Sequence, residues 1–387
     1  SALVITATAL LVVMLLLPGE KVAGLAADQI EAQTGRKLTF GGKVSFTLWP
    51  VLGVKSDRVA FSNAEWAGPE PLLTAERLTI GISASDLLRG KLRVTEVSAV
   101  LPHLNLSERA DGLGNWVLES AADSAGEGAA SPVAPENQEA VLPISIEKLT
   151  LTGASLRYRP HEGEPIEMSS VDMVLQWPDP SGTVNVDLTL RPAGEPLQIK
   201  AELGTFAAFL GGAVSSVGAS VEAEGGLLRF DGRADLTGAA TGRVTAKTSD
   251  TGAFLAAFGQ TGLSLPKGLG QELTIGADAT YTADGRVALR DMELDLDGNI
   301  LTGAVDVALA DVPQFTAQLD GGHLTIPGLA TDVGGAASEG GAAAVGWSQE
   351  PIDASALALA NGTASLSFDS LSVAGYELGV SQLALSL

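Results

Sequence analysis

The chain has 387 residues and no cysteine, which excludes disulfides, zinc–thiolate sites and thiol catalysis. Its net charge of -23 opposes binding to nucleic acid and docking on anionic lipid headgroups through a basic patch. Hydrophobic residues make up 45% of the chain and charged residues only 18%, below the roughly 25% of a typical soluble domain. Any contact with lipid must therefore use apolar surface.

The first residues, "SALVITATALLVVMLLLPGE", contain no charge before Glu20. We predict a transmembrane helix over residues 1–18, truncated at its N-terminus in this sequence, with the acidic body on the non-cytoplasmic side. A cleaved signal peptide is the alternative, for which residues 24–27 offer a weak cleavage site. Apolar residues at helical spacing then predict a short juxtamembrane helix over 19–34, capped by Gly35.

Beyond Gly35 the hydrophobic period changes to two residues, which is typical of antiparallel strands with one apolar and one polar face. In "TVNVDLTL", Val184, Val186, Leu188 and Leu190 alternate with polar residues. Turn residues recur at intervals of about ten, as in a meander. The fold class is therefore mostly β, and we expect a β domain over 35–118, a β-repeat region over 141–330 and the start of a further β region over 351–387.

Two segments lose the alternation and consist mainly of Ala, Gly, Ser, Pro and acidic residues. They cover residues 119–140 and 331–350, and their composition predicts flexible linkers. The last stretch still alternates at Leu387, so we expect the natural protein to continue beyond it.

Two short helical patterns interrupt the middle region. "GTFAAFLGG" carries Phe206 and Phe209, and "TGAFLAAFGQ" carries Phe254 and Phe258. One interpretation is that each helix covers one end of the sheet. The other is that these phenylalanines form the lips of an opening through which a ligand enters.

The sequence shows no arrangement that points to catalysis. His103, His161 and His323 are more than fifty residues apart, and none lies beside a nucleophile motif. "DMELDLDGN" resembles part of a calcium loop, but its acids alternate with apolar residues as on the wet face of a strand. We therefore expect neither an enzyme nor a bound metal or cofactor.

A sheet with one apolar face has to cover that face with another sheet, with helices or with a ligand. Helical sequence is scarce and aromatic residues make up only 5% of the chain. The pattern alone leaves two architectures open: an extended, curled antiparallel sheet that forms a gutter, and a β-sandwich with a dry core.

The leading apolar segment and the strands after it resemble the AsmA family of Gram-negative bacteria. The residues that carry the resemblance are Gly35-Arg36, Gly42, Trp49-Pro50, Asn63-Ala64, Leu72-Leu73, Leu87-Leu88-Arg89-Gly90, Pro102 and Gly114-Asn115-Trp116. Residues 284–330 and 351–387 resemble the distal repeat of the same family. The chain departs from the family pattern in its two low-complexity segments.

The resemblance implies an inner-membrane protein with a single membrane pass and a periplasmic body, acting in outer-membrane biogenesis. Larger relatives are similar to chorein-type bridge proteins, whose curled sheet holds lipid tails, and this favours the groove. The candidates for a groove that binds phospholipid acyl chains are Val184, Val186, Leu188, Leu190, Leu294, Leu296, Val305, Val307 and Leu309. A scaffold for envelope assembly proteins is the alternative function.

Two tryptophans are expected to stabilise the N-terminal sheet rather than bind a ligand. Trp49 precedes Pro50, which would end or bend an edge strand, and Trp116 follows Asn115 in a turn. We therefore predict that both indole rings anchor the N-terminal sheet.

Overall fold

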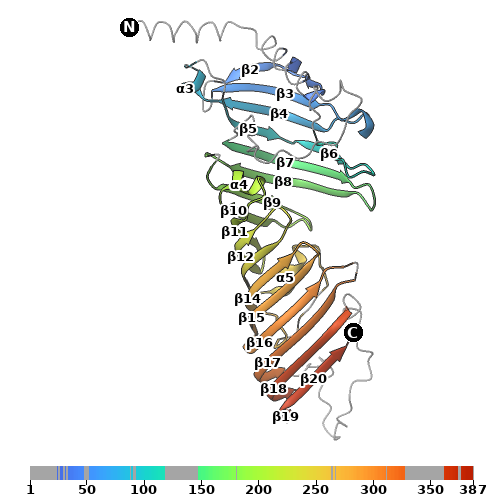
Figure 1. Cartoon of the computed structure of the whole chain (residues 1–387), viewed down its shortest axis with the longest axis vertical. Coiled ribbons are helices and arrows are strands. Elements are labelled where there is room, and N and C mark those ends of the chain that lie inside the picture. The colour runs from blue at the N-terminus through green and yellow to red at the C-terminus, as the bar shows by residue number, and fades with distance from the viewer. Residues whose placement is uncertain are drawn as a thin grey trace, which may run out of the picture. The chain divides into compact units, whose positions relative to one another are not determined.

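The computed structural model describes residues 35–47, 52–87, 89, 93–117, 147–179, 181–262, 265, 267–310, 312–326, 361–373 and 376–386, with Gly24, Ala27, Asp28, Glu31 and Thr34. The fold is mostly β with a few short helices (Figure 1). Among these residues no helix is long and apolar enough to cross a membrane. The predicted anchor, both predicted linkers and Trp49 lie outside them.

The chain divides into two compact units, Ser1–Ser215 and Ser216–Leu387. The strands of the first unit are β1 (Leu38–Phe40), β2 (Val44–Thr47), β3 (Gly53–Phe61), β4 (Leu73–Ile82), β5 (Val94–Val100), β6 (His103–Ser107), β7 (Lys148–Arg159), β8 (Ile166–Gln176), β9 (Val184–Leu190) and β10 (Leu197–Leu203). Besides helical residues between Gly24 and Thr34, the unit contains the 3-10 turn η1 (Glu65–Ala67), α3 (Ala84–Leu87) and α4 (Phe206–Leu210). The alternating apolar residues of these strands supply its core.

The strands of the second unit are β11 (Ser215–Ala223), which starts at the boundary, β12 (Gly226–Ala234), β13 (Ala240–Thr248), β14 (Leu273–Thr282), β15 (Arg286–Leu296), β16 (Asn299–Ala308), β17 (Gln314–Ile326), β18 (Asn361–Val373), β19 (Tyr376–Leu378) and β20 (Ser381–Ser386). One short helix, α5 (Thr251–Ala256), follows β13. Its N-cap is Asp250, whose carboxylate accepts the N–H of Ala253 at 2.9 Å.

The sheets are mixed, and this corrects the expectation of purely antiparallel pairing. In the first unit β5 and β6 both pair with β7 in parallel, and in the second β17 pairs with β18 in parallel. The other registered pairs, such as β7–β8–β9–β10 and β12 to β17, are antiparallel. Side-chain alternation is the same in both kinds of pair, so the pattern could not reveal the direction of a strand.

The parallel pairs occur where the sequence predicts linkers. The segment with residues 119–140 separates β6 from β7, and the segment with residues 331–350 separates β17 from β18. Parallel neighbours need a long connection, because the chain must return to the starting end of the strand. The strands on either side of each low-complexity segment therefore pair directly with each other.

Bulges interrupt several strands and bend the sheet locally. In β7 and β8 the register shifts beside Gly153, at φ 62°, and Ser170, at φ 57°. The carboxylate of Asp172 accepts the N–H of Gly153 at 2.8 Å and lies 3.0 Å from the guanidinium of Arg191. These two contacts hold the pKa of Asp172 below its ordinary value and stabilise the bulge.

Candidate functional site

Apolar side chains from successive strands of the first unit form rows across one face of its sheet. Residues directly opposite one another in the register give one such row: Phe46, Val54, Ile80, Val97, Leu149, Leu175, Val186 and Ala201. Each of these side chains is half-buried. The row extends from β2 to β10 without a polar residue.

The predicted groove residues of β9 share this face. Val184 is 2% exposed, and Val186, Leu188 and Leu190 are half-buried, whereas Asn185 and Asp187 between them are exposed. Across the strand pair, Leu188 lies opposite Ile199 on β10 and Met173 on β8. The predicted alternation of this strand is confirmed, and its role in lipid binding stays a prediction.

The second unit carries the same kind of apolar face. One row contains Leu228, Ala246, Ile275, Leu294, Leu301, Gly321 and Phe368; a neighbouring row contains Ala279, Leu289, Val305, Ala317, Ala364 and Leu385. On the opposite face the strands present exposed polar residues, for example Arg243, Asp278 and Gln318. One face of this sheet is therefore apolar and the other wet.

The structure places the remaining groove candidates unevenly. Leu294, Leu296, Val305 and Val307 are half-buried within β15 and β16, on the apolar face. Leu309 follows the last residue of β16, and its side chain is 53% exposed. Its N–H donates to the carbonyl of Gly285 in a turn, so the alternation ends one residue earlier than the sequence suggests.

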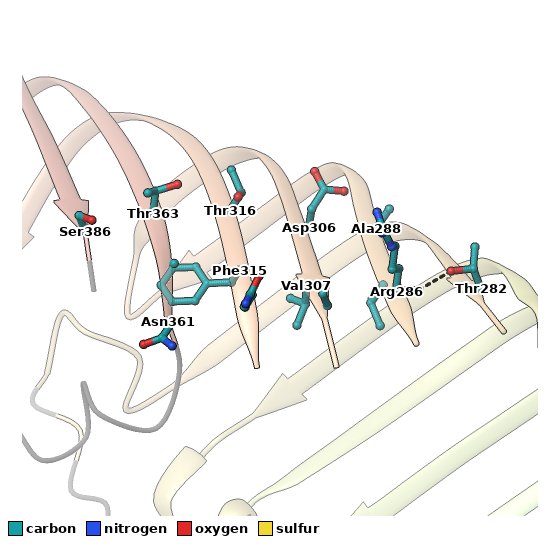
Figure 2. A pocket seen from close by; sticks show the side chains of 14 residues that line it. Thr282, Arg286, Ala288, Asp306, Val307, Phe315, Thr316, Asn361, Thr363 and Ser386 are labelled. Atoms are coloured by element: carbon teal, nitrogen blue, oxygen red, sulfur yellow. Dashed lines mark hydrogen bonds between the residues drawn. The ribbon is translucent and has the colours of Figure 1, made fainter. Parts of the chain in front are cut away.

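A hollow of about 600 Å³ opens where β14 to β18 end on one side (Figure 2). Val287, Val307 and Phe315 contribute apolar walls, and Arg286 and Asp306 contribute charge. Val307 lies directly opposite Val287 on β15 and Phe315 on β17. The apolar row of these three side chains therefore continues into the hollow.

The four phenylalanines proposed as lips have different environments. Phe254 is 8% exposed, and an added Cβ at Gly226 would lie 2.7 Å from its ring, so the ring is packed on the start of β12. Phe258 contacts Phe254 edge-on at 5.2 Å and is 41% exposed. Phe206 meets Trp177 edge-on at 5.0 Å, and Phe209 is half-buried. Phe254 and Phe206 thus cover strand ends.

A buried polar cluster, which sequence reasoning missed as a unit, joins three landmarks of the family resemblance. Asn115 is 0% exposed, accepts the N–H of Ser107 at 2.9 Å, and donates to the carbonyl of Asn105 at 2.7 Å and to Asn63 Oδ1 at 2.9 Å. Arg36, only 8% exposed, donates to the carbonyls of Asn115 and Val117 at 2.5 and 3.0 Å. We call these residues the Asn115 cluster.

The Asn115 cluster fixes the segment that precedes the sheet. The described residues between Gly24 and Thr34 are helical, and Gly35 follows at φ 66° with its N–H 2.8 Å from the carbonyl of Glu31. Arg36 comes next and is held by the loop after β6. The side chain of Trp116 is 44% exposed, so its ring lies outside the interior, and its role as an anchor of the sheet stays a prediction. The neighbouring Asn115 is the buried residue.

A second group of polar contacts, centred on the carboxylate of Asp297, holds the loop before β14. Asp297, in the β15–β16 turn, accepts the N–H groups of Gly268, Gly270, Gln271 and Glu272 at 2.7–3.0 Å. Burial acts to raise the pKa of Asp297, but these four donors outweigh it and hold the pKa below the ordinary value of 3.8. The acids of "DMELDLDGN" are thus engaged by backbone or exposed, with Met292 buried between them.

Replacing Asp297 by asparagine is expected to lower the melting temperature at neutral pH, because the charge-assisted bonds are lost. A lowered folded-state pKa stabilises the fold above the ordinary value of 3.8 and loses that effect as the pH falls through the folded value. The difference in melting temperature between wild type and Asp297→Asn should therefore shrink in acid. Glu293→Gln, at an exposed position of β15, is the control, and a pH-independent difference would contradict the assignment.

Two of the three histidines contact a serine, and His103 Nε2 also lies 3.1 Å from Asn105 Oδ1. His103 Nδ1 lies 2.6 Å from Ser155 Oγ, and His323 Nδ1 lies 2.5 Å from Ser370 Oγ, each across a parallel strand pair. Within the part of the chain that the structure describes, no three His, Cys, Asp or Glu residues are grouped to hold a metal ion. The apolar faces remain the principal candidate site.

No curated protein and no solved structure matches the chain. The sequence model of the AsmA family matches residues 1–186. That range contains β1 to β8, the start of β9 and the whole Asn115 cluster. Residues 1–186, just under half of the chain, are therefore identified as AsmA-family sequence.

Proposed function

We propose that this protein binds or conducts phospholipid acyl chains along its apolar sheet faces, as a membrane-anchored periplasmic protein of outer-membrane biogenesis. The AsmA-family sequence of residues 1–186 suggests a role in envelope biogenesis. The location follows from the predicted anchor at residues 1–18 and from the acidic body. The proposal assigns the protein no enzymatic activity.

The observation that carries the proposal is the incomplete burial of the apolar rows. Val186, Leu188, Val305 and Val307 are half-buried although they lie within strands. A sandwich would bury such side chains against a second layer, about 10 Å away. The described strands are instead assigned to a sheet with no second sheet among them, which supports an apolar side that is accessible to a ligand.

An acyl chain has the chemistry that such a face requires. Each methylene that leaves water contributes about 0.8 kcal/mol, so a chain of about 16 carbons could gain on the order of 10 kcal/mol before entropic losses. The apolar rows contain no polar side chain that would require a hydrogen-bonding partner on the ligand. The apolar face would therefore accept acyl chains of different lengths. The hollow beside Phe315, with Arg286 and Asp306 near it, is large enough for a polar headgroup.

Native mass spectrometry of the purified full chain tests the proposal. We expect adducts with the mass of phospholipids, which organic extraction and thin-layer chromatography should identify. A chain that carries no lipid after purification from membranes in a mild detergent, and takes up none from added vesicles, would favour the scaffold instead.

A further inference from the structure

Two exposed tryptophans lie at one end of the strands of the first unit. Trp66 of η1 is 38% exposed and Trp116 is 44% exposed. η1 follows β3, and Trp116 belongs to the loop after β6, which the Asn115 cluster ties to Asn63 just after β3. Trp177, the third described tryptophan, follows β8 at the opposite strand end, because Gln176 pairs with Lys148 at the start of β7.

Both rings at this end are held in place rather than loose. The guanidinium of Arg109 lies 5.6 Å from the centre of the Trp66 ring. Trp116 lies 6.1 Å from Tyr158 and packs on Gly114, where an added Cβ would clash with the indole. The hydroxyl of Tyr158 in turn donates to Glu108 at 2.6 Å. We call Trp66, Arg109, Trp116 and Tyr158 the tryptophan end.

The described chain enters the first unit at the same end of the sheet, at Arg36. Arg36 donates to the carbonyls of Asn115 and Val117, on either side of Trp116. Fewer than twenty residues separate Arg36 from the uncharged segment that ends at Leu17. With the helix predicted over residues 19–34, at about 1.5 Å per residue, a membrane that holds the run would lie within about 30 Å of Arg36.

Charge at this end suits a zwitterionic lipid surface. The arginines here are paired with acids, since Arg109 pairs with Asp111 and Arg159 lies 3.4 Å from Glu70. Further acids such as Glu65 and Glu162 are exposed at this end and would oppose anionic headgroups. Tryptophan is enriched at membrane–water interfaces, because its ring is apolar while its N–H remains hydrogen-bonded. Arginine beside it can keep its charge among the headgroups.

We propose that the tryptophan end lies in the interface of the bilayer that holds the chain's own N-terminal run, with Trp66 and Trp116 at headgroup level. This orients the first unit with the ends of β3, β6 and β7 toward the membrane. The inference uses the anchored location of the proposed function, but it does not depend on lipid occupying the apolar faces.

Tryptophan quenching by brominated lipid tests the inference. The full chain is reconstituted into nanodiscs of phosphatidylcholine whose acyl chains carry bromine close to the ester, with unbrominated nanodiscs as reference. We expect the bromine-dependent quenching of the wild type to fall markedly in the double variant Trp66→Phe with Trp116→Phe. Trp177→Phe, at the opposite strand end, should leave that quenching unchanged.

The outcomes separate the two proposals. Quenching that the double variant retains in full overturns the membrane contact, as does protection of Trp66 and Trp116 by a copurified protein. Quenching lost only in Trp177→Phe would also overturn it, yet would support lipid on the apolar face, since Trp177 continues the apolar alternation of β8. Circular dichroism checks the fold, and Trp66→Tyr with Trp116→Tyr replaces the phenylalanine variant if that one unfolds.

Discussion

Replacing Asn115 by alanine is expected to destabilise the first unit by several kcal/mol. The substitution removes the acceptor of the Ser107 N–H, which is partly buried, and the donor to the buried Asn105 carbonyl, around a side chain that is 0% exposed. A buried polar group left without a partner costs about 1–3 kcal/mol, so two such groups give roughly 2–6 kcal/mol. The loss should appear as a lower melting temperature.

Hydrogen–deuterium exchange locates the effect. Amides of β1, β6 and the loop from Glu108 to Val117 should exchange faster in Asn115→Ala, because the cluster no longer holds Arg36 against that loop. Trp116→Ala is the matched control: it changes the adjacent, exposed residue and should cost much less. Equal losses in the two variants would show that the ring, and not the amide, stabilises this loop.

The contrast between Asn115 and Trp116 shows what the sequence could not reveal. In "GNW" the large apolar ring is the natural choice for the interior, on hydrophobicity alone. The amide is buried instead because it completes hydrogen bonds with residues 10 and 52 positions away. Such partners come together only when β3 and β6 are placed beside β4, and no local pattern encodes that placement.

The strand faces were largely predictable, since alternation depends only on neighbours in sequence. The prediction of strand faces from alternation fails where a β-bulge inserts an extra residue and reverses which positions point to each face. In β15, Val287 and Leu289 share the apolar face with Leu294 and Leu296, although odd and even positions should point to opposite sides. The register shift beside Asp291, at φ 46°, accounts for the change and puts Met292 in the interior at 3% exposure.

The pairing partners of the strands and their parallel or antiparallel direction could not be predicted from the sequence either. The alternation of β17 and β18 fits a parallel or an antiparallel pair equally well. Only the structure shows His323 opposite Ser370 and Phe315 opposite Gly362 in a parallel register. The continuity of the apolar rows depends on these registers. The alternation of each strand therefore predicted an apolar face for that strand, but not that the apolar faces of neighbouring strands join into a continuous row.

The double variant Val305→Asp with Val307→Asp is expected to fold and to lose bound phospholipid. Both valines are half-buried in β16, opposite Leu289 and Val287 on one side and Ala317 and Phe315 on the other. Two carboxylates in this row would oppose acyl chains, because a charge on an apolar surface must stay hydrated. On an open face water can reach them, so the sheet itself should survive.

Two added charges on the polar face give the control. Thr241→Asp with Thr245→Asp changes the net charge equally, at exposed positions of β13 opposite Arg233 and Arg229. This variant should keep both its fold and its lipid, as measured by circular dichroism and by native mass spectrometry. In a strain that lacks the protein, it should restore outer-membrane integrity, whereas the valine double variant should not.

The behaviour of the valine variant distinguishes a groove from a closed core. A carboxylate buried without a partner costs several kcal/mol, so two of them inside a dry core would unfold the second unit. Unfolding of that variant, with the control intact, would favour a core closed by some further layer. Normal stability with full lipid retention would mean that lipid does not touch Val305 or Val307, and the groove would have to be sought elsewhere. A folded, lipid-free variant beside a folded, lipid-bound control is the result that an open acyl-chain face requires.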